Sequence, residues 1–139
     1  MLRTIPLTLA PLIVFNLFAL NLIGGGGPGD PWSAPLFTVE MLSGARFTLT
    51  SGDLLVIAAV ALLFAEILKA TRTGSATVAD HLLSMIVFVV YLVEFLAVPQ
   101  AAHSVFLILT AIAFIDVVAG FSITIRAARR DVGFETDRY

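Results

Sequence analysis

The sequence predicts an all-α membrane protein: a four-helix transmembrane bundle with a small extracytoplasmic β-hairpin between its first two helices. Three observations lead to this class. The 139 residues are 59% hydrophobic and 13% charged, whereas soluble domains are nearer half apolar and about a quarter charged. Four apolar runs approach or reach the roughly 20 residues that a spanning helix needs. Basic residues gather almost entirely on one side of these runs, as in oriented membrane proteins.

The chain is expected to form one integral membrane domain with four spans, at residues 5–23, 54–72, 81–98 and 104–126. The second span reaches membrane length only by including Lys69 and Arg72, whose long stems can extend to the headgroups. The first run is longer than the apolar core of a signal peptide, so we expect it to be retained. Pro11 should kink the first helix, unless the helix begins there.

The basic residues predict an orientation with both termini in the cytoplasm. The residues on that side are Arg3, Lys69, Arg72, Arg126, Arg129, Arg130 and Arg138. Only Arg46 lies on the other side, in the long loop, and the excess of basic residues marks the cytoplasmic face. The tail 127–139 is charged, lacks helical periodicity and is expected to be cytoplasmic. Short loops without a eukaryotic targeting signal favour a bacterial inner membrane.

The outer loop 24–53 is expected to contain an interfacial tryptophan and a hairpin. Trp32 is placed to lie in the aromatic belt of the outer headgroups. Residues 37–50 alternate between apolar and polar side chains on either side of a Gly-containing turn, which is typical of a hairpin. A three-residue turn would set Val39 opposite Leu49 and give one apolar face. Such a hairpin is marginal in water, so this face should rest on helix ends, the membrane surface or another chain.

Short polar motifs predict where the later helices begin. Thr50 and Asp53 have the spacing of a capping box, as do Thr77 and Asp80. Ser104 is the predicted N-cap of the last helix.

Polar residues within the predicted spans are the candidates for a functional site, because polar groups in a bilayer are costly and commonly functional. They are Asn16, Glu66, Lys69, Tyr91, Glu94 and Asp116. Their depths suggest two layers, with Glu66, Asp116 and Asn16 in one and Glu94 in the other. Glu66 and Lys69 are three residues apart and can pair on one helix.

Small residues at helical spacing predict places where helices approach closely. Ala61 and Ala65 form such a pair in the second span. Ala113 and Gly120 share a face of the fourth span with Asp116.

Two functional hypotheses remain open. In the first, the intramembrane polar groups hold helices together in a non-enzymatic structural or accessory subunit of a membrane assembly. In the second, the carboxylates serve a homo-oligomeric channel or carrier for protons or a small polar solute. The expected partners are the lipid bilayer and either further copies or a larger membrane complex.

Enzymatic and nucleic-acid functions find no support in the sequence. No nucleophile–base pair or phosphate-binding loop is evident, and the few basic residues sit at membrane edges rather than in a nucleic-acid-binding patch. The chain has no cysteine, and the predicted topology separates His81 from His103, so we expect neither a metal site nor a cofactor.

The predicted plan resembles that of claudins. Both ends lie inside, the first outer loop contains β-structure, and the second outer loop is very short. The chain has no loop cysteines, and a shared layout does not by itself imply a function.

Overall fold

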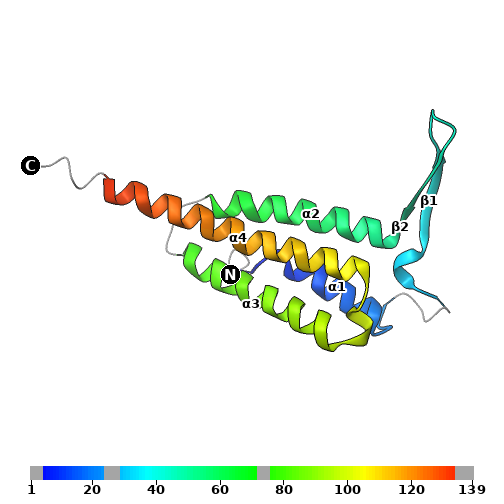
Figure 1. Ribbon diagram of the computed structural model, residues 1–139, viewed down its shortest axis with the longest axis horizontal. Coiled ribbons are helices and arrows are strands. Elements are labelled where there is room, and N and C mark those ends of the chain that lie inside the picture. Colours follow the sequence, from blue (N-terminus) through cyan, green and yellow to red (C-terminus); the bar gives the residue numbers. More distant parts are fainter. Residues whose placement is uncertain (1–4, 24–28, 72–75, 134–139) are drawn as a thin grey trace, which may run out of the picture.

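The computed structural model describes residues 5–23, 29–71 and 76–133 and is mostly helical (Figure 1). The helices are α1 (Leu9–Ala19), α2 (Ser51–Ala70), α3 (Ala76–Ala97) and α4 (Ser104–Gly133), and the strands are β1 (Pro35–Glu40) and β2 (Arg46–Thr50). The four helices lie side by side, and the two strands project from one end (Figure 1). We name this the hairpin end and the opposite end of the bundle the far end.

Helices α2, α3 and α4 are each long and apolar enough to cross a membrane, as predicted for their segments. Helix α1 is different, because only 11 residues of the predicted span 5–23 are helical. At 1.5 Å per residue it is roughly 16 Å long, about half the thickness of a hydrocarbon core. Pro11 is its third residue, where a missing N–H breaks no helical hydrogen bond. The structure therefore follows the alternative in which the helix begins near Pro11.

Helix α4 lies between α2 and α3 and is the most buried of the three long helices. It continues to Gly133, beyond the predicted end at residue 126, and extends past the other helices at the far end (Figure 1). Among the described residues, the largest fully buried side chains are Tyr91, Phe15, Phe106 and Leu109. Phe15 of α1 contacts Phe106 of α4 with ring centroids 4.7 Å apart, so α1 belongs to this core.

Trp32 also belongs to the core, which corrects its predicted place in the headgroup belt. Its side chain is only 6% exposed. The indole stacks on Phe15 at 4.8 Å and contacts Phe18 at 5.3 Å. The loop between α1 and β1 therefore folds back over the end of α1, and aromatic packing seals this end of the bundle.

The hairpin has the predicted faces but a different register. Val39 pairs with Phe47 and Phe37 with Leu49, two residues away from the predicted pairing. A shift of two keeps every side chain on its expected face, because side chains alternate with a period of two. The turn is closed by the Met41 N–H, which donates to the carbonyl of Ala45 at 2.8 Å.

The predicted N-caps are confirmed at one of three helices, although α4 begins at Ser104 as predicted. Thr50 and Asp53 form the full capping box of α2. Helix α3 already begins at Ala76, so Thr77 is not its N-cap. At α4 the cap is the imidazole of His103 rather than Ser104, because Nδ1 of His103 accepts the Val105 N–H at 3.1 Å.

Candidate functional site

The polar residues that the sequence places within the predicted spans come together around one structural element, α1 and the non-helical residues before it. Asn16 belongs to this part of the chain, and the other five form a hydrogen bond to it: Glu66, Lys69, Tyr91, Glu94 and Asp116. Helices α2, α3 and α4 each contribute at least one of them. The short first helix is thus held by polar contacts from all three long helices.

Residues 5–8 precede α1 without forming a helix, so their backbone groups need partners from elsewhere. Glu66 of α2 accepts the Leu7 N–H at 3.1 Å. Lys69 donates to the carbonyl of Ile5 at 3.4 Å. These two contacts fix the start of the chain against α2.

Thr8 is bound from the opposite side of the bundle. The Tyr91 hydroxyl of α3 donates to the Thr8 carbonyl at 2.9 Å. The Thr8 hydroxyl donates to Asp116 of α4 at 3.4 Å. Thr8 itself is 2% exposed, so the non-helical start of α1 lies inside the protein, where its backbone groups need protein partners.

Asn16 forms a separate contact closer to the hairpin end. Its amide donates to Glu94 of α3 at 2.8 Å and to the carbonyl of Leu12 at 3.1 Å. The structure therefore groups Asn16 with Glu94, not with Glu66 and Asp116 as the depth estimate suggested. A short α1 that starts deep in the bundle brings Asn16 to this level.

Six residues at the far end form what we call the far-end polar cluster: Glu66, Lys69, Asp80, His81, Ser84 and Asp116. Lys69 pairs with Glu66 at 2.9 Å and lies 3.5 Å from Asp80. The cluster combines three carboxyl groups with one ammonium group and one imidazole. Buried charges are tolerated where they are paired and hydrogen-bonded, and Lys69 provides this pairing for two of the carboxylates.

A small cavity lies within this cluster. It is lined by Glu66, Ala70, Asp80, His81, Ser84 and Asp116, and it offers about 10 Å³ to the centre of a water molecule, close to the least that holds one. Oδ1 of Asp80 and Nε2 of His81 are buried without a hydrogen-bond partner among the described residues. The described residues contain no group of His, Asp and Glu side chains arranged to hold a metal ion. A single water molecule fits the size and polarity of this space.

Gly120 of α4 lets the His81 ring occupy its place in the cluster. A Cβ at position 120 would lie 2.6 Å from Cε1 of His81 and closer still to Nδ1. The ring also stacks on Phe121 at 6.3 Å. Gly120 is therefore a close-approach position between α3 and α4.

The other predicted packing residues lie in two different surroundings. Ala113 is buried in the core. Ala61 is exposed and Ala65 is half-buried, and exposed Ala58 lies one turn before Ala61. Ala58 and Ala61 thus lie on the outer side of α2, whereas Ala59 of the same helix is buried in the core.

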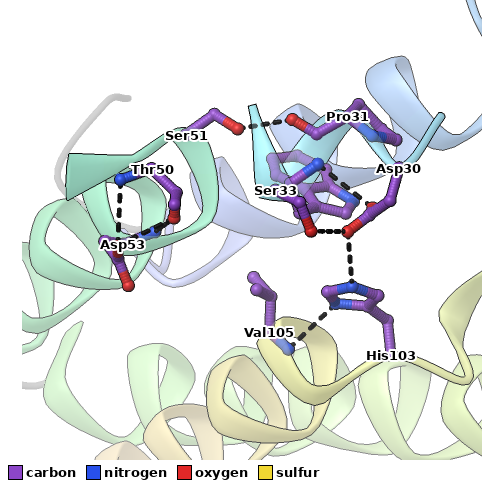
Figure 2. A network of polar contacts seen from close by, with 9 residues as sticks. Asp30, Pro31, Ser33, Thr50, Ser51, Asp53, His103 and Val105 are labelled. Atoms are coloured by element: carbon purple, nitrogen blue, oxygen red, sulfur yellow. Dashed lines mark hydrogen bonds and ion pairs between the residues drawn. The ribbon is translucent and has the colours of Figure 1, made fainter. Parts of the chain in front are cut away.

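A second polar network, the hairpin-end network, joins the loop before β1 to the starts of α2 and α4 (Figure 2). Nε2 of His103 lies 3.2 Å from Asp30, and the Asp30 carboxylate also accepts from the Trp32 N–H and the Ser33 hydroxyl. Because Nδ1 of His103 accepts the Val105 N–H, the ring proton lies on Nε2 and points to Asp30. Burial raises the pKa of Asp30, but these hydrogen bonds outweigh it and hold that pKa below its usual value.

Ser51 completes this network by donating to the carbonyl of Pro31. Beside it lies an open hollow of about 320 Å³, lined by residues that include Phe18, Trp32, Gln100 and His103. The network is largely exposed. Its bonds stabilise turns and helix starts, including the contacts of the loop before β1 with the starts of α2 and α4. It organises the hairpin end of the bundle.

Sequence reasoning missed the parts that Thr8, Asp80, His81 and Ser84 play. The sequence predicts a capping role for Asp80 and considers His81 only as a metal ligand, which the distance from His103 excludes. His81 and Ser84 do share a face of α3 with Tyr91, and that spacing was visible in the sequence. The role of Thr8 had no local signal, because it depends on where α1 begins.

No family, curated protein or solved structure matches the chain.

Proposed function

We propose that the chain is a small, non-enzymatic integral membrane protein that serves as a structural or accessory subunit of a membrane assembly. Three helices have mean hydropathies of 2.1, 1.9 and 2.4 over membrane-length windows. Their outward faces carry large apolar side chains that a soluble protein of this size would rarely expose. Among them are Leu54, Ile57, Val60, Phe64, Leu82, Ile86, Val93, Leu107, Phe114, Val118 and Phe121.

The orientation follows from the basic residues of the sequence. Both termini and the far end would face the cytoplasm, and the hairpin end with Arg46 would face outward. The setting would be a bacterial inner membrane, with the short α1 completing a fourth, partly non-helical crossing.

The observation that carries the accessory role is the outward face of α2. Ala58, Ala61 and Ala65 form a strip of small side chains along it, beside larger ones such as Ile57 and Phe64. In membranes, helices associate where small side chains let backbones approach closely. Ala58 and Ala61 are exposed in the part of the chain that the structure describes, so the strip is open to a helix of another copy or of a different subunit.

The use of the polar groups supports the same role. The carboxyl and amide groups within the bundle each bind α1, the segment before it or a neighbouring helix. Interhelical bonds of this kind in membranes contribute about 0.6 kcal/mol on average and up to about 1.7. They hold this fold together and require no transported solute.

Extraction from the source membrane in a mild detergent, followed by mass measurement of the intact complex, tests this role. Wild-type protein should elute as part of a larger assembly. Ala61→Phe should release it as a monomer because the bulky ring separates the two helices. Val60→Phe is the matched control, since Val60 is also exposed on α2 but lies off the strip.

A monomeric wild-type protein, or equal behaviour of the two variants, would contradict the accessory role at this surface. The mass of the assembly separates a homo-oligomer from a complex with other subunits.

The far-end cavity favours a second candidate function, a homo-oligomeric channel or carrier for protons or a small polar solute. Its three carboxyl groups, and its two polar atoms that lack a partner among the described residues, are suited to exchange protons through a bound water. Asp116→Asn keeps the acceptor for Thr8 and removes one titrating group. On the carrier hypothesis, flux into reconstituted vesicles should collapse while the fold survives; on the accessory hypothesis, wild type shows no flux and the variant is nearly silent.

A further inference from the structure

One face of the hairpin is apolar and uncovered. Its side chains are about half exposed: Phe37 54%, Val39 47%, Met41 50% and Phe47 46%. The opposite face is polar, with the hydroxyl groups of Thr38 and Thr48 2.9 Å apart and Glu40 paired in register with Arg46. Since an isolated two-stranded hairpin is marginal in water, the apolar face needs a surface to cover it.

The direction of the hairpin indicates which surface is available. The strands run across the direction of the long helices and leave the bundle sideways at its end (Figure 1). If α2, α3 and α4 cross a bilayer, the hairpin runs along the membrane surface instead of into the water. A strand of six residues reaches about 20 Å, which carries the hairpin from the protein over the surrounding lipid.

The base of the hairpin indicates which face turns toward the membrane. Leu49 is the apolar-face residue nearest α2, and it is half-buried, whereas Thr48 on the polar face is exposed. Strand β2 ends at Thr50 and α2 begins at Ser51, so no flexible loop separates them. The apolar face therefore turns toward the bundle at its base. Leu54 and Ile57, exposed in the first two turns of α2, extend the lipid-facing surface up to that base.

The backbone limits how deeply the hairpin lies. A two-stranded sheet has an unpaired backbone edge on each side, and hydrocarbon cannot satisfy those groups. In the headgroup region water and lipid headgroups can. We propose that the hairpin is a membrane-surface element, with Phe37, Val39, Met41 and Phe47 inserted at headgroup depth and its polar face in water. This inference rests on the proposed placement of the bundle in a bilayer.

Single cysteines in this cysteine-free chain provide the test. Full-length Val39→Cys and Thr48→Cys, labelled with an environment-sensitive fluorophore, report the two faces of the hairpin. Phe64→Cys, at an exposed site of α2, reports whether the bundle is embedded. The proteins are placed in phosphatidylcholine vesicles with the hairpin facing outward, and aqueous iodide is compared with nitroxide-bearing lipids as quencher.

At position 39 we expect quenching by a shallow nitroxide lipid and at least threefold weaker quenching by iodide than at position 48. Position 64 should be quenched by a deep nitroxide lipid. A second pair, Phe47→Cys and Thr38→Cys, repeats the comparison on the opposite strands. Agreement between the two pairs shows that the result does not come from a local disturbance by one substitution.

Equal iodide quenching at positions 39 and 48 would overturn the inference, because the hairpin would then stand free in water. Protection of position 39 without lipid quenching, increasing with the protein-to-lipid ratio, would overturn it in favour of a second copy covering the face. Both results leave membrane placement intact if position 64 is lipid-quenched. Absence of quenching at position 64 would instead reject the placement itself, and the inference with it.

Discussion

The two polar networks of this molecule use the same residue types in opposite surroundings. The far-end polar cluster is mostly buried, joins α2 and α4 to the chain before α1, and links α2 to α3 through Lys69 and Asp80. Two of its polar atoms have no partner among the described residues. The hairpin-end network is largely exposed, and its bonds close turns and helix starts close to one another in space (Figure 2). Water can readily replace a lost partner at the exposed hairpin end, whereas the cavity of the far-end cluster has room for about one water molecule. Equivalent substitutions should therefore have much larger effects in the far-end cluster.

Removing Glu66 is the strongest way to sharpen this contrast. Glu66→Ala leaves the Leu7 N–H without its acceptor and removes the nearer carboxylate of Lys69. Breaking a buried pair by removing one partner should lower the free energy of unfolding by about 3 kcal/mol. Denaturation in mixed micelles measures it. Glu66→Gln keeps an acceptor for the Leu7 N–H, so its free energy of unfolding should fall clearly less than that of Glu66→Ala. Equal decreases in the two variants would show that hydrogen bonding to Leu7 contributes little.

Gly120→Ala tests the close approach of α3 and α4 in the same cluster. The new methyl group would collide with the His81 ring, and overpacking of this kind costs roughly 1–3 kcal/mol. The double variant Gly120→Ala, His81→Ala should recover part of that loss, since the obstructing ring is gone. A double-mutant cycle in the same micelles measures the coupling. If the two effects simply add, the ring is not what excludes a side chain at position 120.

Tyr91→Phe removes a single hydroxyl from the group that holds Thr8. The carbonyl of Thr8 loses its donor at 2.9 Å while the aromatic ring stays in the core. A loss of about 1 kcal/mol is expected for one buried hydrogen bond. Backbone hydrogen exchange in α1 should also increase, because this bond fixes its start. Unchanged exchange there would indicate that α1 is held by its apolar contacts alone.

Acidification should produce the smallest effect, at the hairpin end. The pKa of Asp30 in the folded protein is held below its usual value. The contribution of Asp30 to the free energy of unfolding is therefore complete above about pH 4. It disappears as the pH falls through the pKa of the folded state. Because the Asp30–His103 pair is solvent-exposed, the free energy of unfolding should change by less than about 1 kcal/mol. Stability profiles of wild type and Asp30→Asn should differ above pH 4 and converge below it. Parallel profiles throughout would contradict this role of Asp30.

Much of the fold followed from the sequence because each long helix is specified locally. Apolar runs of membrane length predicted α2, α3 and α4, and the Thr50–Asp53 spacing predicted the start of α2 through its capping box. The two faces of the hairpin followed from alternation. Its register did not, because registers that differ by two residues present the same faces.

The first helix shows where local signals were insufficient. The run 5–23 is apolar along most of its length, so hydropathy could not distinguish a full helix from a short one with an irregular start. That start depends on Glu66, Tyr91 and Asp116, which lie far along the chain. Trp32 was misplaced for a similar reason, since its partners Phe15 and Phe18 meet it only after the loop folds back.

The dispersed anchoring of residues 5–8 also sets an order of events during synthesis. Leu7 is bonded across 59 residues of chain, and Thr8 across 83 and 108. At roughly 5–20 residues per second of translation, Thr8 waits about 5–20 s after its own synthesis for Asp116 to appear. This early-synthesised segment is thus among the last to reach its final place, and until then its backbone groups need temporary hydrogen-bond partners.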